Sequence, residues 1–473
     1  MQVGKFSFAR GEKMVFVDWL HVDAGYGFKA RGKAPEKMPR GVKIVNVKPW
    51  ITLDPILEAD KPWEADFIGA YISMVQEDDG RYRVWYEAFP DYKNDGTSFL
   101  CHAISHDGMH WEKPDVGLVE WNGTLENNIL FTPAMHPRGH GLHGLYVFKD
   151  SNPSCKHDER YKLVYTAPDP EGRGRRCHGA VSPDGLRWHL LDDPIVKEPC
   201  WADTQTIIEW NDNLACYIGF FRSWWHNRRQ VYQGTSTDFS RWKNLTPVLV
   251  SDPNFPPDHD WYTNGFHQWP GAQNASILMP TIYRRSKDDL QVEMRASRDT
   301  THWYRLPINP ILDPSQRKIF QGGVYLGHGI ITLPDGTWNL PVGVPGYFHN
   351  ETRIPGSRKG KVFLAKWRQD GFTGIKACPE GSFWTQPFRF SGSSVEINLD
   401  APPGGHARIG IQDEFTGKYL PGFSIDDCRI PGHYETWHQL AWRNGGSLEE
   451  YQDCRIRLHV ELLRSTVHGF RFL

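Results

Sequence analysis

Short runs in which apolar and polar residues alternate recur along the chain, whereas long helical patterns do not. The run "RYKLVY" at 160–165 has the period of two that is typical of a half-buried strand. The run "RYRVWYEA" at 81–88 matches "RYKLVYTA" at 160–167 in residue type at nearly every position. The spacing of these two runs predicts an all-β chain built from repeats.

A second pattern, Ser-x-Asp-x-x-x-Trp, which we call the Asp–Trp box, marks the repeats more clearly. It occurs in four full copies, and a weaker fifth copy surrounds Asp370 in "RQDGFTG". We expect the Asp to form a tight turn between a third and a fourth strand, and the Trp to pack between neighbouring sheets. Four strands in each repeat of some 55–80 residues predict a β-propeller with one sheet per blade. The four full copies span 105–111, 182–188, 236–242 and 297–303.

The repeats divide the chain into a five-bladed propeller over 1–378 and a second domain over 379–473. Residues 1–62 are expected to wrap the propeller or close its ring. After about residue 380, clean alternation in "SVEINLDAP", "ARIGIQDE" and "RIRLHVELL" predicts a β-sandwich, for packing or oligomerisation. A sixth blade is the alternative, but this part has no Asp–Trp box. The expected blades span about 63–125, 140–197, 201–250, 260–312 and 320–378.

Composition narrows the classes of function. The formal charge of −2 over 473 residues argues against a strongly cationic nucleic-acid surface. The chain has no run of 18 apolar residues, so no membrane span is predicted. The first residues lack the apolar segment of a secretory signal, so a cytoplasmic protein is expected, or a secreted or periplasmic one if a signal has been removed. The eight cysteines form no C-x-x-C pair, which favours reduced thiols.

Five blades with Asp–Trp boxes and a small β-sandwich resemble the five-bladed-propeller glycoside hydrolases. These are the invertase/fructanase and arabinanase/xylosidase families and, more distantly, the mannoside phosphorylases. The fructosidase signatures W-M-N-D-P-N-G, R-D-P and E-C are absent. The resemblance implies a carbohydrate pocket at the propeller axis, carboxylates on the innermost strands, and hydrolysis of a furanoside or a plant or algal oligosaccharide. It implies no required cofactor, and it specifies no structural ion.

Propeller geometry selects the candidate carboxylates. The start of each innermost strand and the loop between the second and third strands should share the pocket face, with the Asp–Trp boxes at its outer rim. Hydrolysis of a glycoside needs two carboxyl groups, one as the acid and one as the base or nucleophile. By the resemblance, Glu64 or Asp66 is the base or nucleophile, and Asp203 stabilises charge or tunes a pKa. Glu87 and Glu351 are the choices for the acid. For each, a structural cap or an ion pair is the competing interpretation.

Polar and aromatic residues at the same places are candidates for binding sugar. The pair of Trp residues in the expected loop "SWWHNRR" suits the C–H face of a sugar ring, although packing between blades is the alternative. The spacing His136-x3-His140-x2-His143 is weak as a metal signal because the segment is rich in Gly and has no helical register. We therefore assign no metal ligands. The candidates for substrate binding are His140, His143, Arg222, Trp224, Trp225, His226, Tyr262, Asn264, Arg284 and His349.

Three functions follow from this interpretation. The first is a glycosidase with a carbohydrate as its only predicted partner besides a further copy of itself. The second is a phosphorylase on the same scaffold, which needs a single catalytic acid and a phosphate site made by Arg222, Arg228, Arg284 or Arg285. The third is a carbohydrate-binding propeller without catalysis, which predicts that no two carboxylates meet in the pocket.

Overall fold

The structure is a computed structural model in which all regular elements are strands or 3-10 turns of three residues. It describes residues 6–24, 37–65, 67–90, 95–169, 172, 174–196, 203–351, 360–431, 433–452 and 454–473. Within these ranges no helix is long and apolar enough to cross a membrane. The predicted all-β class is confirmed. The 3-10 turns are η1 (Pro62–Glu64), η2 (Asp95–Thr97), η3 (Pro133–Met135), η4 (His157–Glu159), η5 (Pro314–Gln316), η6 (Lys318–Phe320), η7 (Ile425–Asp427) and η8 (Glu449–Tyr451).

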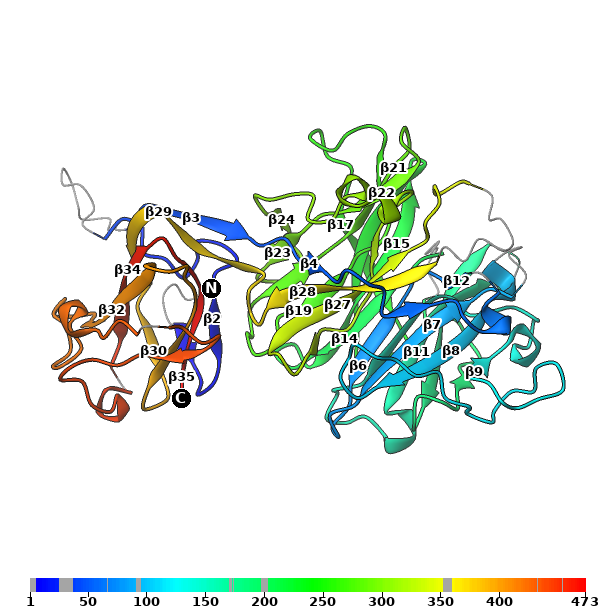
Figure 1. Ribbon diagram of the computed structural model, residues 1–473, viewed down its shortest axis with the longest axis horizontal. Helices are drawn as coiled ribbons and strands as arrows, with labels where there is room; N and C mark the ends of the chain where they lie inside the picture. Colours follow the sequence, from blue (N-terminus) through cyan, green and yellow to red (C-terminus); the bar gives the residue numbers. More distant parts are fainter. Residues whose placement is uncertain are drawn as a thin grey trace.

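Three four-stranded antiparallel sheets follow one another along the chain, each with its strands in sequence order (Figure 1). The first holds β6 (Ser73–Gln76), β7 (Tyr82–Ala88), β8 (Phe99–Ser105) and β9 (Ile129–Phe131). The second holds β10 (His143–Lys149), β11 (Tyr161–Pro168), β12 (Arg175–Ser182) and β13 (His189–Leu190). The third holds β14 (Ile207–Asn211), β15 (Cys216–Trp225), β16 (Arg228–Ser236) and β17 (Lys243–Leu249).

The next segment forms two sheets where the repeat pattern predicts one. One sheet holds β18 (His259–Trp261), β21 (Thr281–Arg284) and β22 (Asp289–Val292). The other holds β19 (Phe266–Gln268), β20 (Ser276–Leu278), β23 (Arg295–Ser297) and β24 (Tyr304–Arg305). A further sheet joins β25 (Tyr325–Leu326), β26 (Ile331–Thr332), β27 (Thr337–Val344) and β28 (Lys361–Arg368) to β4 (Trp50–Ile51) and β5 (Leu57–Glu58).

Ten strands from both ends of the chain make a separate sheet, which lies to one side of the others in Figure 1. Strands β3 and β29 pair antiparallel in this sheet, with Asn46 opposite Thr373. Strands β1, β2 and β3 therefore extend this sheet, and β4 and β5 extend the sheet of β28. The strands are β1 (Phe6–Phe8), β2 (Lys13–Val15), β3 (Arg40–Asn46), β29 (Thr373–Trp384), β30 (Phe388–Phe390), β31 (Val395–Asp400), β32 (His406–Asp413), β33 (His438–Gln439), β34 (Ile456–Leu463) and β35 (Thr466–Phe472).

Apolar cores lie between successive sheets, which explains why the middle strands are apolar on both faces. In β7, for example, every residue from Val84 to Ala88 is buried. One core joins the first and second sheets, and another joins the second, the third and the strands after them. The core that contains Val84 also contains Ile331 of β26 and Val362 of β28. The sheet of β26 and β28, the last of this series, thus packs against the first sheet.

The Asp of each box forms the predicted turn. The Asp107 carboxylate accepts hydrogen bonds from the N–H groups of Met109 and His110, both at 2.8 Å. The predicted packing of Trp between sheets also holds for Trp303, whose ring lies 5.8 Å from that of Phe220 in β15. The boxes are therefore structural, as expected from their repetition.

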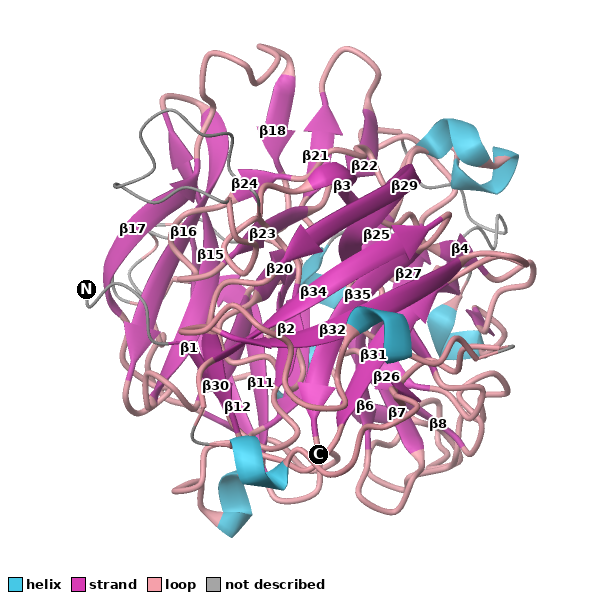
Figure 2. Ribbon diagram, turned by 90° about the vertical axis from the view of Figure 1, so that its left-hand side faces the viewer, coloured by secondary structure: helices cyan, strands magenta, loops and turns pink. Residues whose placement is uncertain are grey.

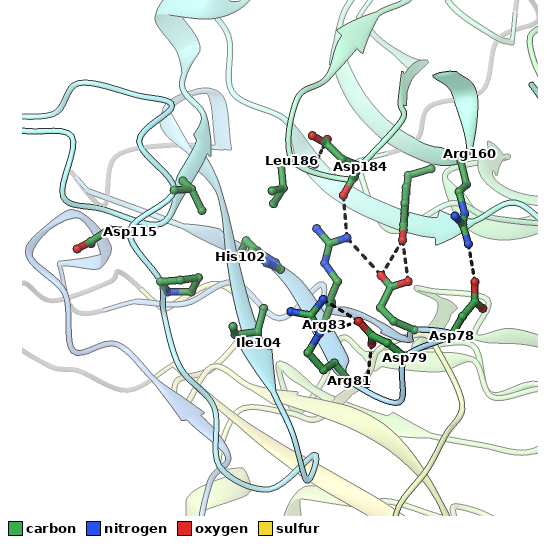
Figure 3. A pocket seen from close by; sticks show the side chains of 14 residues that line it. Asp78, Asp79, Arg81, Arg83, His102, Ile104, Asp115, Arg160, Asp184 and Leu186 are labelled. Atoms are coloured by element: carbon green, nitrogen blue, oxygen red, sulfur yellow. Dashed lines mark hydrogen bonds and ion pairs between the residues drawn. The ribbon is translucent and has the colours of Figure 1, made fainter. Parts of the chain in front are cut away.

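The expected position of the boxes at the rim of the pocket face is wrong. Ser105 pairs with Tyr82 across β7 and β8, beside the turn between β6 and β7. Connections of an antiparallel meander alternate between its two ends, so the first and third connections share one end. At that end a groove of about 620 Å³ runs between the first two sheets (Figure 3). The boxes thus lie at the end opposite the β7–β8 and β11–β12 connections.

Ion pairs and hydrogen bonds hold the walls of this groove together (Figure 3). Arg83 Nη1 donates to the Asp184 carbonyl oxygen at 2.7 Å and lies 3.2 Å from the Glu77 carboxylate. The Tyr161 hydroxyl also donates to Glu77, at 2.7 Å, and Arg160 pairs with Asp78 at 2.6 Å. Because these charged groups already pair with one another across two sheets, we interpret the groove as a structural contact that holds the first sheet to the second.

Candidate functional site

A cavity of about 280 Å³ lies at the end of the sheets opposite the boxes. Two of the predicted carboxylates line it, Glu87 at the end of β7 and Asp203 before β14. Other grooves are larger, but this cavity collects residues from the starts of several inner strands, as the prediction from propeller geometry requires. It is therefore the candidate site.

Glu87 is fully buried at the base of one wall. One carboxylate oxygen lies 3.1 Å from His143 Nδ1, and the other accepts a hydrogen bond from the Leu145 N–H at 3.2 Å. Gly69 gives the chain room to pass: a Cβ there would lie 3.1 Å from Glu87 Oε2. Glu87 is thus held by the second sheet while its side chain borders the cavity.

Asp203 is more open, with 34% of its side chain exposed, and it forms an ion pair with the buried Arg222. The ion pair requires Asp203 in its carboxylate form. The Arg222 guanidinium lies 4.9 Å from the ring centre of Tyr262, within reach of a cation–π contact. Burial lowers the pKa of this guanidinium, which remains far above neutral pH as arginine always does. Asp203 therefore presents a charged oxygen to the cavity from a rigid support.

Aromatic rings make up most of the remaining wall. The ring centres of Tyr71 and Tyr325 lie 5.9 Å apart, as do those of Tyr262 and Tyr325, in edge-to-face contact. His349 packs on Tyr262 at 5.0 Å. Burial raises the pKa of Tyr71 well above its usual value, so its hydroxyl is a hydrogen-bond donor at neutral pH. Apolar rings with polar edges suit a ligand such as a sugar, which also has apolar and polar surfaces.

A buried carboxylate, Asp260, positions the arginines beside the cavity. It is fully buried and binds Arg229 Nη1 at 2.8 Å and Arg285 Nη2 at 2.8 Å. Arg228 Nε lies 3.3 Å from its other oxygen. Of these three arginines, Arg229 lines the cavity. Asp260 is thus a structural anchor that fixes one cationic wall residue.

Several predicted residues lie outside the cavity. Glu64 is fully buried, and its carboxylate binds the Tyr86 hydroxyl at 2.6 Å and Lys113 Nζ at 2.8 Å. Glu351 is exposed and accepts a hydrogen bond from the Phe348 N–H at 2.9 Å. Both environments favour the structural interpretation over catalysis. Asp66 lies outside the described residues.

The predicted binding residues divide in the same way. His143, Tyr262 and His349 line the cavity, and Arg222 supports it. Arg284 instead pairs with Asp289 and Asp313 along a different groove. Asn264 is buried and donates to the carbonyl oxygens of Gln205 and Phe220, which fixes the scaffold. His140 Nδ1 lies 2.6 Å from the Gly141 carbonyl oxygen, and His140 is not among the wall residues.

The segment "SWWHNRR" is the tip of a β-hairpin and not the predicted loop. Trp224 and Trp225 belong to β15, and His226 and Asn227 form a two-residue turn with φ of 48° and 60°. Positive φ at both central residues is typical of the type I′ turn, whose twist matches the twist of the strands. Trp224, Trp225 and His226 are exposed at this tip.

Sequence reasoning missed Tyr71, Tyr325, Phe67 and Tyr347, all of which line the cavity. These four residues are aromatic, and Tyr71 and Tyr325 have no charged or amide neighbour of the kind that singled out Tyr262 beside Asn264. The signal was available, because Tyr71, Tyr262 and Tyr325 each precede or begin an innermost segment of a repeat. Among the described residues, no group of three or more His, Cys, Asp and Glu side chains could hold a metal ion.

No known family model matches the chain. Over 171 residues, a third of this chain, it is 27% identical to a Mycobacterium tuberculosis (strain ATCC 25618 / H37Rv) protein described as uncharacterized. It is 28% identical over 163 residues to a second uncharacterized protein, from the CDC 1551 / Oshkosh strain of that species. The matches span about half the length of these two relatives.

Similar solved structures include one described as a glycoside hydrolase, with 11% identity, a TM-score of 0.47, and coverage of 68% of this chain and 92% of the other. A GH32 β-fructofuranosidase of Bombyx mori has 13% identity and a TM-score of 0.43, with 95% of each chain covered. A structure from the GH130 family of mannoside phosphorylases and glycoside hydrolases has 16% identity and a TM-score of 0.42, over 68% and 94% of the two chains. Similarities this weak do not assign an activity.

Proposed function

We propose that this chain is a glycosidase that hydrolyses its substrate in the cavity of Glu87 and Asp203. The observation that carries the proposal is the meeting of these two carboxylates, far apart in sequence, on the wall of one cavity lined with aromatic rings. A pair of carboxyl groups around one small cavity is what glycoside hydrolysis requires. A binding module without catalysis needs no such pair.

We assign the acid to Glu87 and the charged role to Asp203. Glu87 is buried, and only Asp203 has an arginine partner that requires its negative charge. In the reaction the glycosidic C–O bond breaks while the Glu87 proton moves to the leaving oxygen. Water supplies the oxygen that bonds to the anomeric carbon, directly or after a covalent step on Asp203, and its proton returns to a carboxylate. The resemblance to propeller glycosidases points to furanosides and to plant or algal oligosaccharides as substrates.

The proposed scaffold is a propeller of five blades followed by a β-sandwich over 379–473. The support is the packing of each sheet on the next and of the last on the first. In this interpretation the two sheets built from residues 259–305 share the fourth blade, because both lie between the third sheet and the sheet of β27. The cavity then lies at one end of the axis.

The phosphorylase alternative receives less support from the charges. Each arginine predicted to hold phosphate already has a carboxylate partner: Arg222 pairs with Asp203, Arg228 and Arg285 pair with Asp260, and Arg284 pairs with Asp289. The first of these pairs would have to break for phosphate to bind. Arg284 also lies along another groove.

The test is a screen of aryl glycosides and oligosaccharides, including arabinofuranosides, fructosides and β-mannosides, with and without inorganic phosphate. We expect turnover that does not depend on phosphate. Glu87→Gln should reduce kcat by about 10²–10⁴-fold, the usual contribution of a general acid. Glu126→Gln, at an exposed carboxylate that is not among the wall residues of the cavity, is the matched control and should retain full activity. Strict dependence on phosphate would make the chain a phosphorylase, and an active Glu87→Gln variant would exclude Glu87 as the acid.

A further inference from the structure

The hairpin of β15 and β16 presents its two tryptophans on opposite faces. Trp224 pairs with Arg229, and Trp225 pairs with Arg228. Successive residues of a strand point to opposite faces, while directly paired residues share a face. Trp224 and Arg229 are therefore on one face of the hairpin, and Trp225 and Arg228 are on the other.

The face of Trp224 is continuous with the cavity. Arg229 lines the cavity, and its guanidinium lies 4.6 Å from the ring centre of Trp224. The same guanidinium lies 5.2 Å from the ring of Tyr262, another wall residue. Arg222, two residues before Trp224 and on the same face, pairs with Asp203. A row of Trp224, Arg229 and Tyr262 thus leads from the hairpin tip into the cavity.

The hairpin tip is fixed rather than free. Arg229 is bound to the buried Asp260, and Arg285 Nη2 donates to the Asn227 carbonyl oxygen in the turn at 2.9 Å. Arg228 Nη2 donates to the His259 carbonyl oxygen, which ties the opposite face to β18. A platform held in place by its neighbours loses little conformational entropy when a ligand binds. Trp224 nevertheless leaves 37% of its surface exposed.

The cavity is too small to contain a long substrate. Its volume of about 280 Å³ lies at the lower edge of the range of about 300–1,000 Å³ typical of pockets for small ligands. An oligosaccharide that places its scissile bond at Glu87 and Asp203 must therefore extend past the rim. Along the row described above, the exposed apolar surface next to the rim is the ring of Trp224.

We infer that Trp224 is an outer sugar-binding residue, and that the substrate is an oligosaccharide that extends past the rim of the cavity, with one of its units stacked on the Trp224 ring. The inference rests on the proposed function, because the position of the oligosaccharide follows from placing its scissile bond at Glu87 and Asp203. Arg229 has a second role in it: its guanidinium supports the Trp224 ring and offers N–H donors to sugar hydroxyls. Trp225, on the far face, takes no part.

The test compares Trp224→Ala with Trp225→Ala on substrates of increasing length. For oligosaccharides of three to five units, Trp224→Ala should raise KM about tenfold, as expected for the loss of one aromatic stacking contact, with kcat changed less than about twofold. For an aryl monoglycoside it should change neither constant. Trp225→Ala should match the wild type throughout. Trp224→Tyr keeps an aromatic face and should restore most of the loss, which separates stacking from misfolding.

A binding measurement keeps the inference separate from the proposed function. The same oligosaccharides are titrated calorimetrically into the Glu87→Gln variant with and without Trp224→Ala. Affinity that increases with chain length and loses this increase in the Trp224→Ala background supports the inference, even if no substrate is turned over. Turnover with no effect of Trp224, or an equal effect of Trp224→Ala and Trp225→Ala, overturns the inference and leaves the proposed hydrolysis standing.

Discussion

At the scale of single residues, Glu64 and Glu87 show why burial alone does not identify a catalytic group. Both are fully buried. The Glu64 carboxylate binds Tyr86, Lys113 and the N–H groups of two preceding residues, at 2.6–3.0 Å, whereas Glu87 borders a cavity. The sequence predicted both as candidates because Glu64 precedes an innermost strand and Glu87 precedes the connection between a second and a third strand. The difference depends on contacts with Lys113 and His143 that no local pattern reveals.

We therefore predict that Glu64→Gln lowers stability without slowing the reaction. The Lys113 side chain is only 5% exposed and would lose its buried carboxylate partner while keeping the exposed carboxylate of Asp60, so the free energy of unfolding should fall by about 1–3 kcal/mol. Urea unfolding gives the loss, and kcat per folded molecule should stay within about twofold of the wild type. A stable Glu64→Gln protein that has lost turnover would return Glu64 to the catalytic site.

At the scale of elements, the sequence correctly predicted that the boxes form turns, but it placed them at the wrong end of the sheets. Four copies of one pattern identify the turn because the Ser and Asp side chains accept hydrogen bonds from the local N–H groups. Their place at one end of the sheets follows from the order of the strands, because successive connections of an antiparallel meander alternate between its two ends. The hairpin tip was missed because polar residues such as His226 and Asn227 read as a loop, while the strands continue through Trp225 and Arg228.

The second box gives stability a defined dependence on pH. Burial acts to raise the pKa of Asp184, but hydrogen bonds from the N–H groups of Arg187 and Leu186 outweigh it and lower the pKa. A carboxyl with a lowered pKa stabilises the fold above its unfolded pKa of about 3.9, and this contribution is lost as the pH falls towards the folded value. Urea unfolding at pH 7 should show Asp184→Asn to be less stable than the wild type. The difference should shrink below about pH 4, and a difference independent of pH would contradict this role.

At the scale of the whole molecule, contacts between the ends of the repeat series hold the sheets together. Gly108, in the first box, has φ of +74°, and a Cβ there would lie 2.3 Å from Leu333, which follows β26. The general repeat architecture was visible in the sequence. The split of residues 259–305 into two sheets and the recruitment of β1–β3 into the ten-stranded sheet were not. Both depend on pairings between distant segments, such as the parallel pair of β1 and β30.

We predict that Gly108→Ala is more destabilising than an equivalent change elsewhere. Gly80 is the matched control, since its φ of +86° is similar but no atom lies within 4 Å of an added Cβ. Gly80→Ala should cost about 1 kcal/mol through backbone strain alone. Gly108→Ala should cost about 1–3 kcal/mol more, because Leu333 must move. Equal melting temperatures for the two variants would show that this contact does not join the first sheet to the last.

The most direct test of the proposed pair of carboxylates is the turnover of Asp203→Asn on the best substrate from the screen, at saturating concentration. The change preserves the size of the side chain and removes the charge that pairs with Arg222. Asp54→Asn, at an exposed carboxylate, serves as the control. We expect kcat to fall by at least about a hundredfold in Asp203→Asn alone, with the fold intact by circular dichroism. Full activity of Asp203→Asn would contradict the proposed pair of carboxylates and remove this cavity as the site of hydrolysis.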